Sequence, residues 1–165
     1  MKSLKIALVG ATGMVGRTML KVLEQRKFPV VKLVPVASTK SIGTTIDFNG
    51  DSVEVVGIET ALGMDLDLAL FSAGGALSTE WAPKFASKGV VVVDNSSAFR
   101  MSEKHKLVIP EINGSVLTEE DMIIANPNCT TMQLLMALKP LHDLYNIERG
   151  VVNTYQSVTG TGAAA

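Results

Sequence analysis

The opening segment of the chain places the strongest restriction on its fold. Leu4–Val9 is a short, nearly continuous apolar run, typical of a β-strand that is buried on both faces. Gly10, Gly13 and Gly16 follow at GxxGxxG spacing, and apolar residues then recur at helical spacing as far as residue 23. The sequence therefore predicts a strand, a glycine loop and a helix in direct succession.

This glycine loop is typical of a nucleotide site. Gly10 permits a tight turn, Gly13 lets the backbone approach a pyrophosphate, and Gly16 permits close packing of the helix on the strand. The amides at the start of the helix then donate to the phosphates. A tight turn without a ligand, in some other α/β fold, is the alternative.

The rest of the chain continues the alternation of strands and helices. Strands are expected over residues 30–37, 66–72 and 90–93 and at 123–124, with helical stretches ending near residue 86 and following Cys129. Two short β segments are expected around residues 45–48 and 52–56, joined by an Asn-Gly turn. Such alternation predicts a doubly wound (Rossmann-type) α/β domain with a mostly parallel sheet. Pro35 places the second strand near a sheet edge.

Two domains are expected. Residues 1–130 form the nucleotide-binding domain, with the cysteine at its end. Residues 131–165 supply a helix and the first strand, Ile147–Gln156, of an incomplete α+β domain. A frayed tail added to the edge of the sheet is the alternative for this last segment.

Composition excludes several classes of protein. The chain is 47% hydrophobic and 19% charged, and its 15 basic and 16 acidic side chains give a net charge of -1, so nothing points to nucleic acid. No apolar run approaches the roughly 18 residues of a membrane span. A single cysteine excludes an internal disulfide framework and fits a reducing compartment, so we expect a cytoplasmic protein. No metal site is expected.

The end of the second predicted strand bears on the choice of cofactor. NAD sites usually carry an acidic residue there, but no Asp or Glu occurs between Glu24 and Asp47. Hydroxyl groups precede Lys40 and Ser41, and this set suits the 2′-phosphate of NADP(H). Lys40 as an ordinary surface lysine is the alternative. After the 66–72 strand, Ser72 and Gly74 are further candidate cofactor contacts, unless this loop merely starts a helix.

Cys129 is the candidate nucleophile. Pro127 disfavours helix at the residue before it, and Asn128 is a good N-cap, so the thiol is expected in the first turn of a helix. Open amides and the positive end of the helix dipole favour an anion there. A small buried hydrophobic side chain is the alternative role for a free cysteine.

A candidate anion site follows the valine-rich strand. The polar loop Asp94–Arg100 lies at the carboxyl edge of a central strand, and its arginine suits a phosphate or carboxylate ligand. A surface ion pair between Arg100 and Glu103 is the alternative.

Taken together, the motifs closely resemble aspartate-β-semialdehyde dehydrogenase, over the N-terminal half of that enzyme. The motifs that carry the resemblance are Gly10–Gly16, Asp94–Arg100, Pro110–Asn113, Pro127–Cys129 and Thr154–Gly160. This family is about twice as long as the present chain. Where it often has Ser-Gly-Ala-Gly, this chain has Thr-Gly-Thr-Gly, starting at Thr159.

The resemblance implies reductive dephosphorylation of β-aspartyl phosphate by NADPH, giving aspartate semialdehyde and phosphate, in the biosynthesis of lysine (through diaminopimelate), threonine and methionine. It implies that Cys129 forms an acyl-thioester, that Gln156 positions the substrate and that Arg100, with Asn128, binds the phosphate. It also implies a homodimer. The cofactor contacts that it implies are Thr12, Gly13, Met14, Val15, Lys40, Ser41, Thr159 and Gly160.

The family's acid/base histidine lies beyond residue 165. Neither His105, expected in solvent, nor His142, expected to pack or lie at the surface, takes its place, so the isolated chain is expected to be inactive. N-acetyl-glutamyl-phosphate reductase is a rival, but it usually has Gly where this chain has Asn128 and Asp where it has Ala98. A nucleotide-binding module without turnover is the other alternative.

Overall fold

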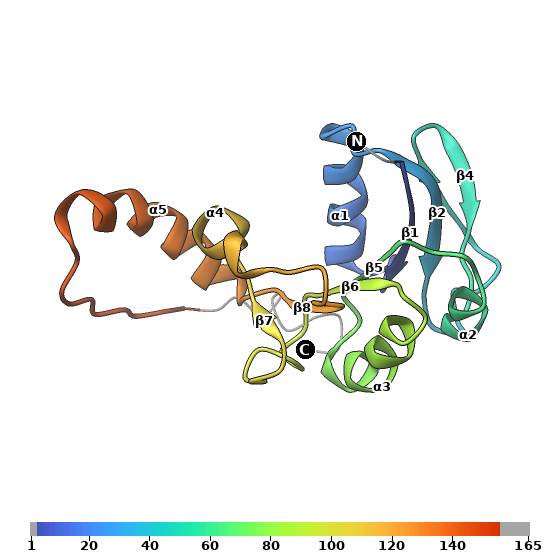
Figure 1. Ribbon diagram of the computed structural model, residues 1–165. Coiled ribbons are helices and arrows are strands. Elements are labelled where there is room, and N and C mark those ends of the chain that lie inside the picture. The colour runs from blue at the N-terminus through green and yellow to red at the C-terminus, as the bar shows by residue number, and fades with distance from the viewer. Residues whose placement is uncertain (1–2, 156–165) are drawn as a thin grey trace.

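The computed structural model describes residues 3–155, and its centre is a six-stranded sheet in which every neighbouring pair is parallel (Figure 1). In spatial order the strands are β2 (Val30–Val36), β1 (Leu4–Val9), β5 (Leu68–Phe71), β6 (Val91–Asp94), β8 (Ile123–Ala125) and β7 (Lys106–Leu107). The chain moves from β1 to β2 on one side and then to β5 on the other, so the strand order reverses between β1 and β5. The predicted doubly wound fold is confirmed, and β2, which carries Pro35, lies at an edge of this sheet.

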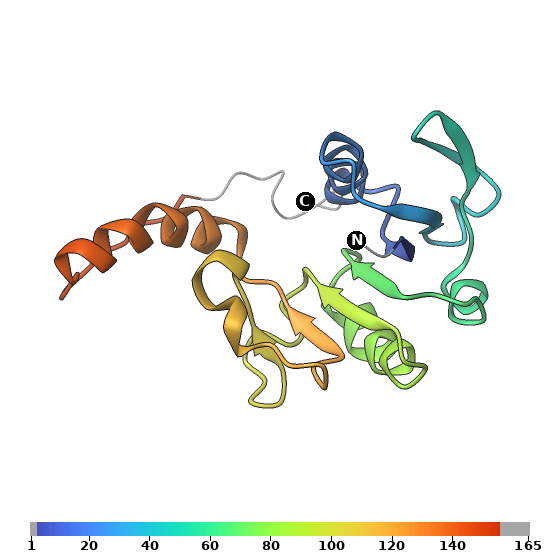
Figure 2. The same ribbon diagram turned by 45° about the horizontal axis from the view of Figure 1, so that its top comes forward.

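Helices cover the two faces unequally. On one face, α2 (Ile58–Leu62) and α3 (Gly75–Ala86) enclose the larger core, which includes Phe71 and Phe85 in edge-to-face contact at 5.5 Å. On the other face, α1 (Met14–Gln25) packs over β1 and β2 (Figure 2). This division follows from the alternation of side chains along each strand.

The α1 face is only partly covered. Leu8, on β1, is fully buried in the cluster that α1 caps. On the same face, Leu70, Val93 and Ile124 of the next three strands are only half-buried. Parallel sheets are usually covered on both faces, so β5, β6 and β8 present an incompletely shielded surface here.

The predicted Asn-Gly turn joins an antiparallel hairpin, β3 (Thr45–Phe48) and β4 (Asp51–Glu54). Asn49 and Gly50 both have positive φ, at 53° and 88°, as a type I′ turn requires. The hairpin buries Phe48 in the cluster under α1. It lies in the connection between β2 and β5, outside the parallel sheet.

Several short elements escaped prediction. Besides α2 and β7 they are α4 (Pro110–Asn113) and the 3-10 turn η1 (Gly114–Val116). None exceeds five residues, so none has room for a recognisable period.

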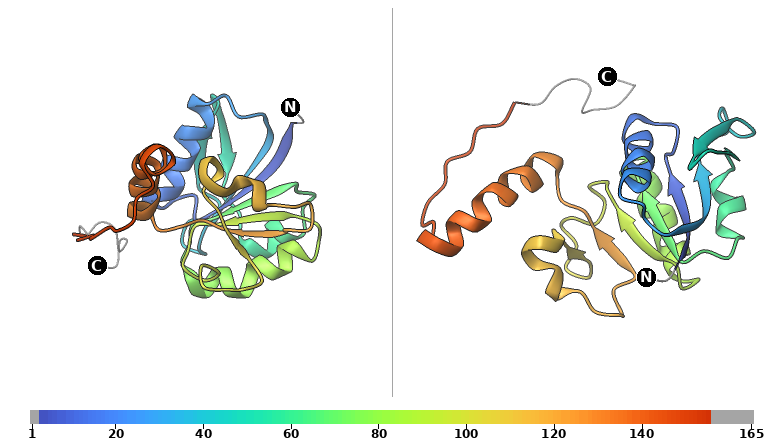
Figure 3. Two further views of the ribbon diagram at one scale, coloured as in Figure 1. Left: turned by 60° about the vertical axis from the view of Figure 1, so that its left-hand side comes forward. Right: turned by 90° about the horizontal axis from the view of Figure 1, so that it is seen from above.

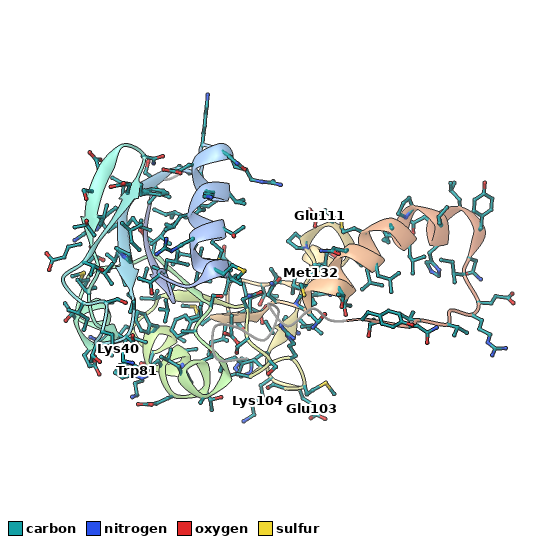
Figure 4. All side chains as sticks on the ribbon, turned by 180° about the vertical axis from the view of Figure 1, so that it is seen from behind. Lys40, Trp81, Glu103, Lys104, Glu111 and Met132 are labelled. Carbon is teal, nitrogen blue, oxygen red and sulfur yellow. The ribbon has the colours of Figure 1, made fainter. Side chains whose placement is uncertain are left out.

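The helix predicted after Cys129 is α5 (Cys129–Tyr145), and none of its residues is buried. It contacts α4 and extends away from the sheet (Figure 3). The side chains of α5 project outward around the helix (Figure 4). Met132 lies near the start of α5, and Glu111 lies on α4.

The strand expected over Ile147–Gln156 is not found. Residues 147–155 have no regular secondary structure, and Gln156 lies outside the described residues. A strand forms only where a neighbouring strand satisfies its backbone groups, and none of the described strands pairs with this segment.

Candidate functional site

The glycine loop adopts a geometry that only glycines permit. Gly10 has a φ of +90°, in the region that L side chains rarely adopt. A Cβ on Gly13 would lie 3.3 Å from the carbonyl oxygen of Gly10, and one on Gly16 would lie 2.2 Å from the same oxygen. Within the described residues no side chain caps α1, so the amides of its first turn are open to an anion.

A cleft of about 430 Å³ opens beside this loop, within the usual range of ligand sites. Its walls come from the β1–α1 loop, the end of β2, the start of α2 and the β5–α3 loop. The lining residues are Val9, Gly10, Thr12, Gly13, Val36, Ala37, Ser38, Thr39, Ile42, Gly57, Ile58, Glu59, Ser72, Ala73 and Leu77. The cleft meets the switch in strand order between β1 and β5, where doubly wound sheets bind ligands.

Only some of the predicted cofactor residues line this cleft. Gly10, Thr12, Gly13 and Ser72 do. The others lie around it without lining it: Met14 and Val15 are exposed in the first turn of α1, Lys40 is exposed (Figure 4), Ser41 is half-buried in the turn after β2, and Gly74 precedes α3. At the end of β2 the lining hydroxyl residues are Ser38 and Thr39.

Glu59 is a lining residue that sequence reasoning missed. It is exposed in the first turn of α2, and its carboxylate lies near Gly57, where a Cβ would be 3.5 Å from Oε2. The acidic residue sought for an NAD site was expected at the end of the second strand. Glu59 instead reaches the cleft from α2, a helix of five residues that is too short to be predicted from a periodic pattern.

The carboxyl edge of the sheet is aligned by one repeated backbone contact. The first residue after each of three strands donates its N–H to the last residue of the strand beside it: Ser72 to Val9, Asn95 to Phe71 and Asn126 to Asp94, each at 2.8 Å. Since neighbouring strands are about 4.8 Å apart, the glycine loop after β1 and the cysteine loop after β8 lie about 14 Å apart along one edge.

Cys129 occupies the predicted position. It is the first residue of α5 and is exposed. Asn128 is the N-cap: its Oδ1 accepts hydrogen bonds from the N–H of Thr130 at 3.0 Å and from the Thr130 hydroxyl at 2.6 Å. The Cys129 thiol lies 4.0 Å from the same oxygen. The alternative of a buried hydrophobic cysteine does not hold for this chain.

Arg100 is turned toward the cysteine loop. Its Nε donates to the carbonyl oxygen of Asn126 at 2.9 Å, and its Nη2 donates to the carbonyl oxygen of Asn95 at 3.0 Å. Among the described residues its remaining three N–H groups have no protein partner, and the alternative ion pair with Glu103 is not formed.

The buried carboxylate of Asp94 anchors the Asp94–Arg100 loop. Asp94 is 0% exposed, and its oxygens accept from the Ser78 hydroxyl at 2.6 Å, the Ser96 hydroxyl at 2.6 Å and the Ser96 N–H at 3.2 Å. The Ser96 hydroxyl also accepts from the N–H of Ala98 at 3.1 Å. The loop that carries Arg100 is thereby fixed to α3 through Ser78.

Neither histidine hydrogen-bonds to Cys129 or Arg100 within the described residues. His105 was expected in solvent, but it is half-buried: its ring lies 4.7 Å from that of Phe99, and its Nδ1 shares a hydrogen bond of 2.8 Å with the Ser102 hydroxyl. His142 is exposed in the last turn of α5. The predicted site residues Gln156, Thr159 and Gly160 lie outside the described part of the chain.

Within residues 3–155 no group of three or more His, Cys, Asp or Glu residues is placed to hold a metal ion. In the same part of the chain, no helix is both long and apolar enough to cross a membrane.

Comparison with known proteins identifies the family. The family described as "Semialdehyde dehydrogenase, NAD binding domain" matches residues 5–120. The chain belongs to the semialdehyde dehydrogenase family. The matched part contains the glycine loop, the cleft and Arg100, and it ends before Cys129.

Individual relatives of this family extend the match. An aspartate-semialdehyde dehydrogenase of Aquifex aeolicus is 52% identical over 164 residues, covering 98% of this chain and 48% of the relative. The crystal structure of aspartate semialdehyde dehydrogenase II from Vibrio cholerae has a TM-score of 0.91 at 50% identity, over 99% of this chain and 49% of that one. A second Vibrio cholerae structure, complexed with ASA, has a TM-score of 0.84 at 49% identity, over 90% of this chain and 49% of that one. The chain spans about half the length of these relatives.

Proposed function

We propose that this chain supplies the cofactor cleft and the nucleophile of an aspartate-semialdehyde dehydrogenase, which reduces β-aspartyl phosphate to aspartate semialdehyde and phosphate with NADPH. The observation that carries the proposal is the exposed thiol of Cys129 at the capped start of α5, beside the loop of Arg100. The Vibrio cholerae relative complexed with ASA supports the choice of substrate.

The glycine loop fits a dinucleotide. The absence of Cβ atoms at Gly10 and Gly13 lets the loop pack tightly on itself and on Ser72, and the first turn of α1 offers uncapped amides to a pyrophosphate. Thr12, Ser38, Thr39 and the neighbouring Lys40 supply hydroxyls and a cation for the ribose and its 2′-phosphate. When bound, NADPH supplies the hydride that reduces the acyl group.

The chemistry of the chain's own residues centres on Cys129. Its thiolate attacks the acyl carbon, so that a C–S bond forms as the acyl–phosphate bond breaks and phosphate leaves. The free N–H groups of Arg100 hold the departing phosphate, and the first-turn amides of α5 stabilise the oxyanion. Gln156 is proposed to position the substrate. Reduction of the thioester then regenerates the thiolate.

The second domain is proposed to begin within α5. None of the 17 residues of this helix is buried, and its exposed apolar side chains include Leu141 and Leu144. These observations support residues 131–165 as the start of a further domain that carries the acid/base group and the dimer contacts. The whole protein is proposed to be a cytoplasmic homodimer in the biosynthesis of lysine, threonine and methionine.

The test compares the 165-residue chain with a protein extended to the length of its relatives. The extended protein should oxidise aspartate semialdehyde with NADP⁺ and phosphate, and Cys129→Ser should abolish turnover while NADPH binding remains. The short chain should bind NADPH without comparable turnover, because loss of general acid–base catalysis alone costs a factor of about 10² to 10⁴. Full activity in Cys129→Ser would refute the proposed nucleophile. Equal activity of the two lengths would place the acid/base group within this chain.

A further inference from the structure

We propose that Asn126 is a positioning residue for the nucleophile, and that its side-chain hydrogen bond to Asn95 fixes Cys129 relative to Arg100. The inference rests on the proposed function, because it takes Cys129 as the nucleophile. It adds two residues, from the loops after β6 and β8, to which the sequence assigned no role.

All polar groups of Asn126 except its side-chain oxygen form hydrogen bonds to the Asp94–Arg100 loop. Its N–H donates to the carbonyl oxygen of Asp94 at 2.8 Å, and its carbonyl oxygen accepts from Arg100 Nε at 2.9 Å. Its Nδ2 donates to Oδ1 of Asn95 at 2.7 Å. Asn126 is therefore held to this loop by three hydrogen bonds, each 2.9 Å or shorter.

The contacts close into a ring of three residues. Arg100 donates to the carbonyl oxygens of both Asn126 and Asn95, and the two asparagine side chains bond to each other. Asn95 is itself held to β5, because its N–H donates to the carbonyl oxygen of Phe71 at 2.8 Å. Every member of the ring is half-buried, where hydrogen bonds hold position better than in water.

The ring reaches Cys129 through a short, stiff connection. Pro127 is buried and has a fixed φ, and Asn128 is locked as the N-cap of α5. Apart from its contact with α4, α5 has no buried residue, so packing along this helix contributes less than the ring to fixing its first residue. The position of the thiol is thus set mainly from its N-terminal side, by the ring.

The experiment measures alkylation of Cys129, the only cysteine, by iodoacetamide between pH 5 and 10 in the 165-residue chain. Asn126→Ala, Asn95→Ala and the double variant form a cycle of uncharged changes, so that no new charge acts on the thiol. Asn113→Ala is the matched control: it also removes a half-buried amide, whose Oδ1 accepts from the N–H of Ile109 and whose Nδ2 donates to the carbonyl oxygen of Leu107, at 2.9 Å each. Asn113 lies outside the ring but on α4, so this control also reports any effect of the α4–α5 contact on the thiol. Thermal unfolding establishes that each variant is folded at the assay temperature.

Each single ring variant should slow alkylation at pH 7 about tenfold, toward the rate of a free thiol, because the thiol is no longer held at the open amides of the first turn. The double variant should react no more slowly than either single variant, because both substitutions break the same hydrogen bond, between the side chains of Asn126 and Asn95. Asn113→Ala should leave the profile in place. If Asn126→Ala fails to fold, Asn95→Ala removes the same bond and tests the proposal alone.

Unchanged profiles in folded ring variants would overturn the proposal, as would an equal slowing in Asn113→Ala, which would indicate general loosening. These outcomes are separate from failure of the proposed function. If the unsubstituted chain alkylates no faster than a free thiol, Cys129 is not an activated nucleophile and both ideas fall. If Cys129 is alkylated rapidly both in the unsubstituted chain and in the ring variants, only the positioning role of Asn126 is refuted.

Discussion

A Cβ built on Gly10 would lie 2.4 Å from the backbone carbonyl oxygen of Ser72, so the glycine loop and the β5–α3 loop are too close to leave room for a side chain at residue 10. Both residues line the cleft. The shape of the proposed cofactor site therefore depends on the absence of a side chain at residue 10.

Gly10→Ala should lower the free energy of unfolding in two ways. The positive φ costs about 1–2 kcal/mol for a residue with a Cβ, and the contact with Ser72 adds roughly 1–3 kcal/mol. Gly89→Ala is the control, because Gly89 has a φ of +81° but open space around its Cβ position. Urea unfolding of both variants separates the two costs, and equal losses would show that the contact relaxes freely. Gly10→Ala should also weaken NADPH binding.

Asp94→Asn should destabilise the chain by roughly 1.5–3 kcal/mol. Asp94 accepts three hydrogen bonds, one buried and two part-buried, and an amide in its place has one NH₂ group that can only donate. Ser78→Ala, which leaves both Ser96 contacts intact, should cost less, about 1 kcal/mol. Urea denaturation measures both. A smaller loss for Asp94→Asn than for Ser78→Ala would mean that the carboxylate is not the anchor of this loop.

NADPH should bind more tightly than NADH. Lys40→Glu should reduce the difference between the two binding free energies by about 1–3 kcal/mol, because one charge-assisted contact to the 2′-phosphate is lost. Glu59→Gln tests the acidic group that does line the cleft: it should not weaken NADPH binding. Fluorescence titration of both cofactors provides the affinities. A preference for NADH that disappears in Glu59→Gln would instead assign Glu59 to the ribose hydroxyls.

The stability of the chain should decline in acid partly through Asp121. The N–H of Thr118 donates to its carboxylate at 2.8 Å, with help from the Thr118 hydroxyl and Lys106, and holds the pKa of Asp121 below its ordinary value of 3.8. A lowered folded-state pKa adds stability above that ordinary value, and the stability is lost as the pH falls through the folded value. Thermal unfolding should therefore favour the unsubstituted chain over Asp121→Asn at pH 7, with the difference in stability closing as the pH falls below 3.8. A difference that is constant with pH would exclude this contribution.

Those parts of the fold that arise from short-range rules could be predicted from the sequence. The strand at Leu4–Val9, the turn at Asn49 and Gly50, and the start of α5 at Cys129 each depend on a few consecutive residues. Their apolar period, positive-φ residues and N-cap are all legible in the chain itself. The strand expected over Ile147–Gln156 was wrong over its described part, residues 147–155, because a strand depends on a partner that no local rule supplies.

The partners of the site residues were decided by tertiary structure alone. Asn95 and Asn126 are 31 residues apart, and Arg100 and Asn126 are 26 apart, so neither contact leaves any periodic trace in the sequence. Glu59 reaches the cleft only because α2 packs beside the end of β2. Chain-local energies choose helix, strand and turn, whereas the loops at the carboxyl edge take their neighbours from the order of strands in the sheet. The sequence by itself thus determined the longer helices and strands and the position of Cys129 at the start of α5, and the order of the strands determined which side chains lie beside the thiol.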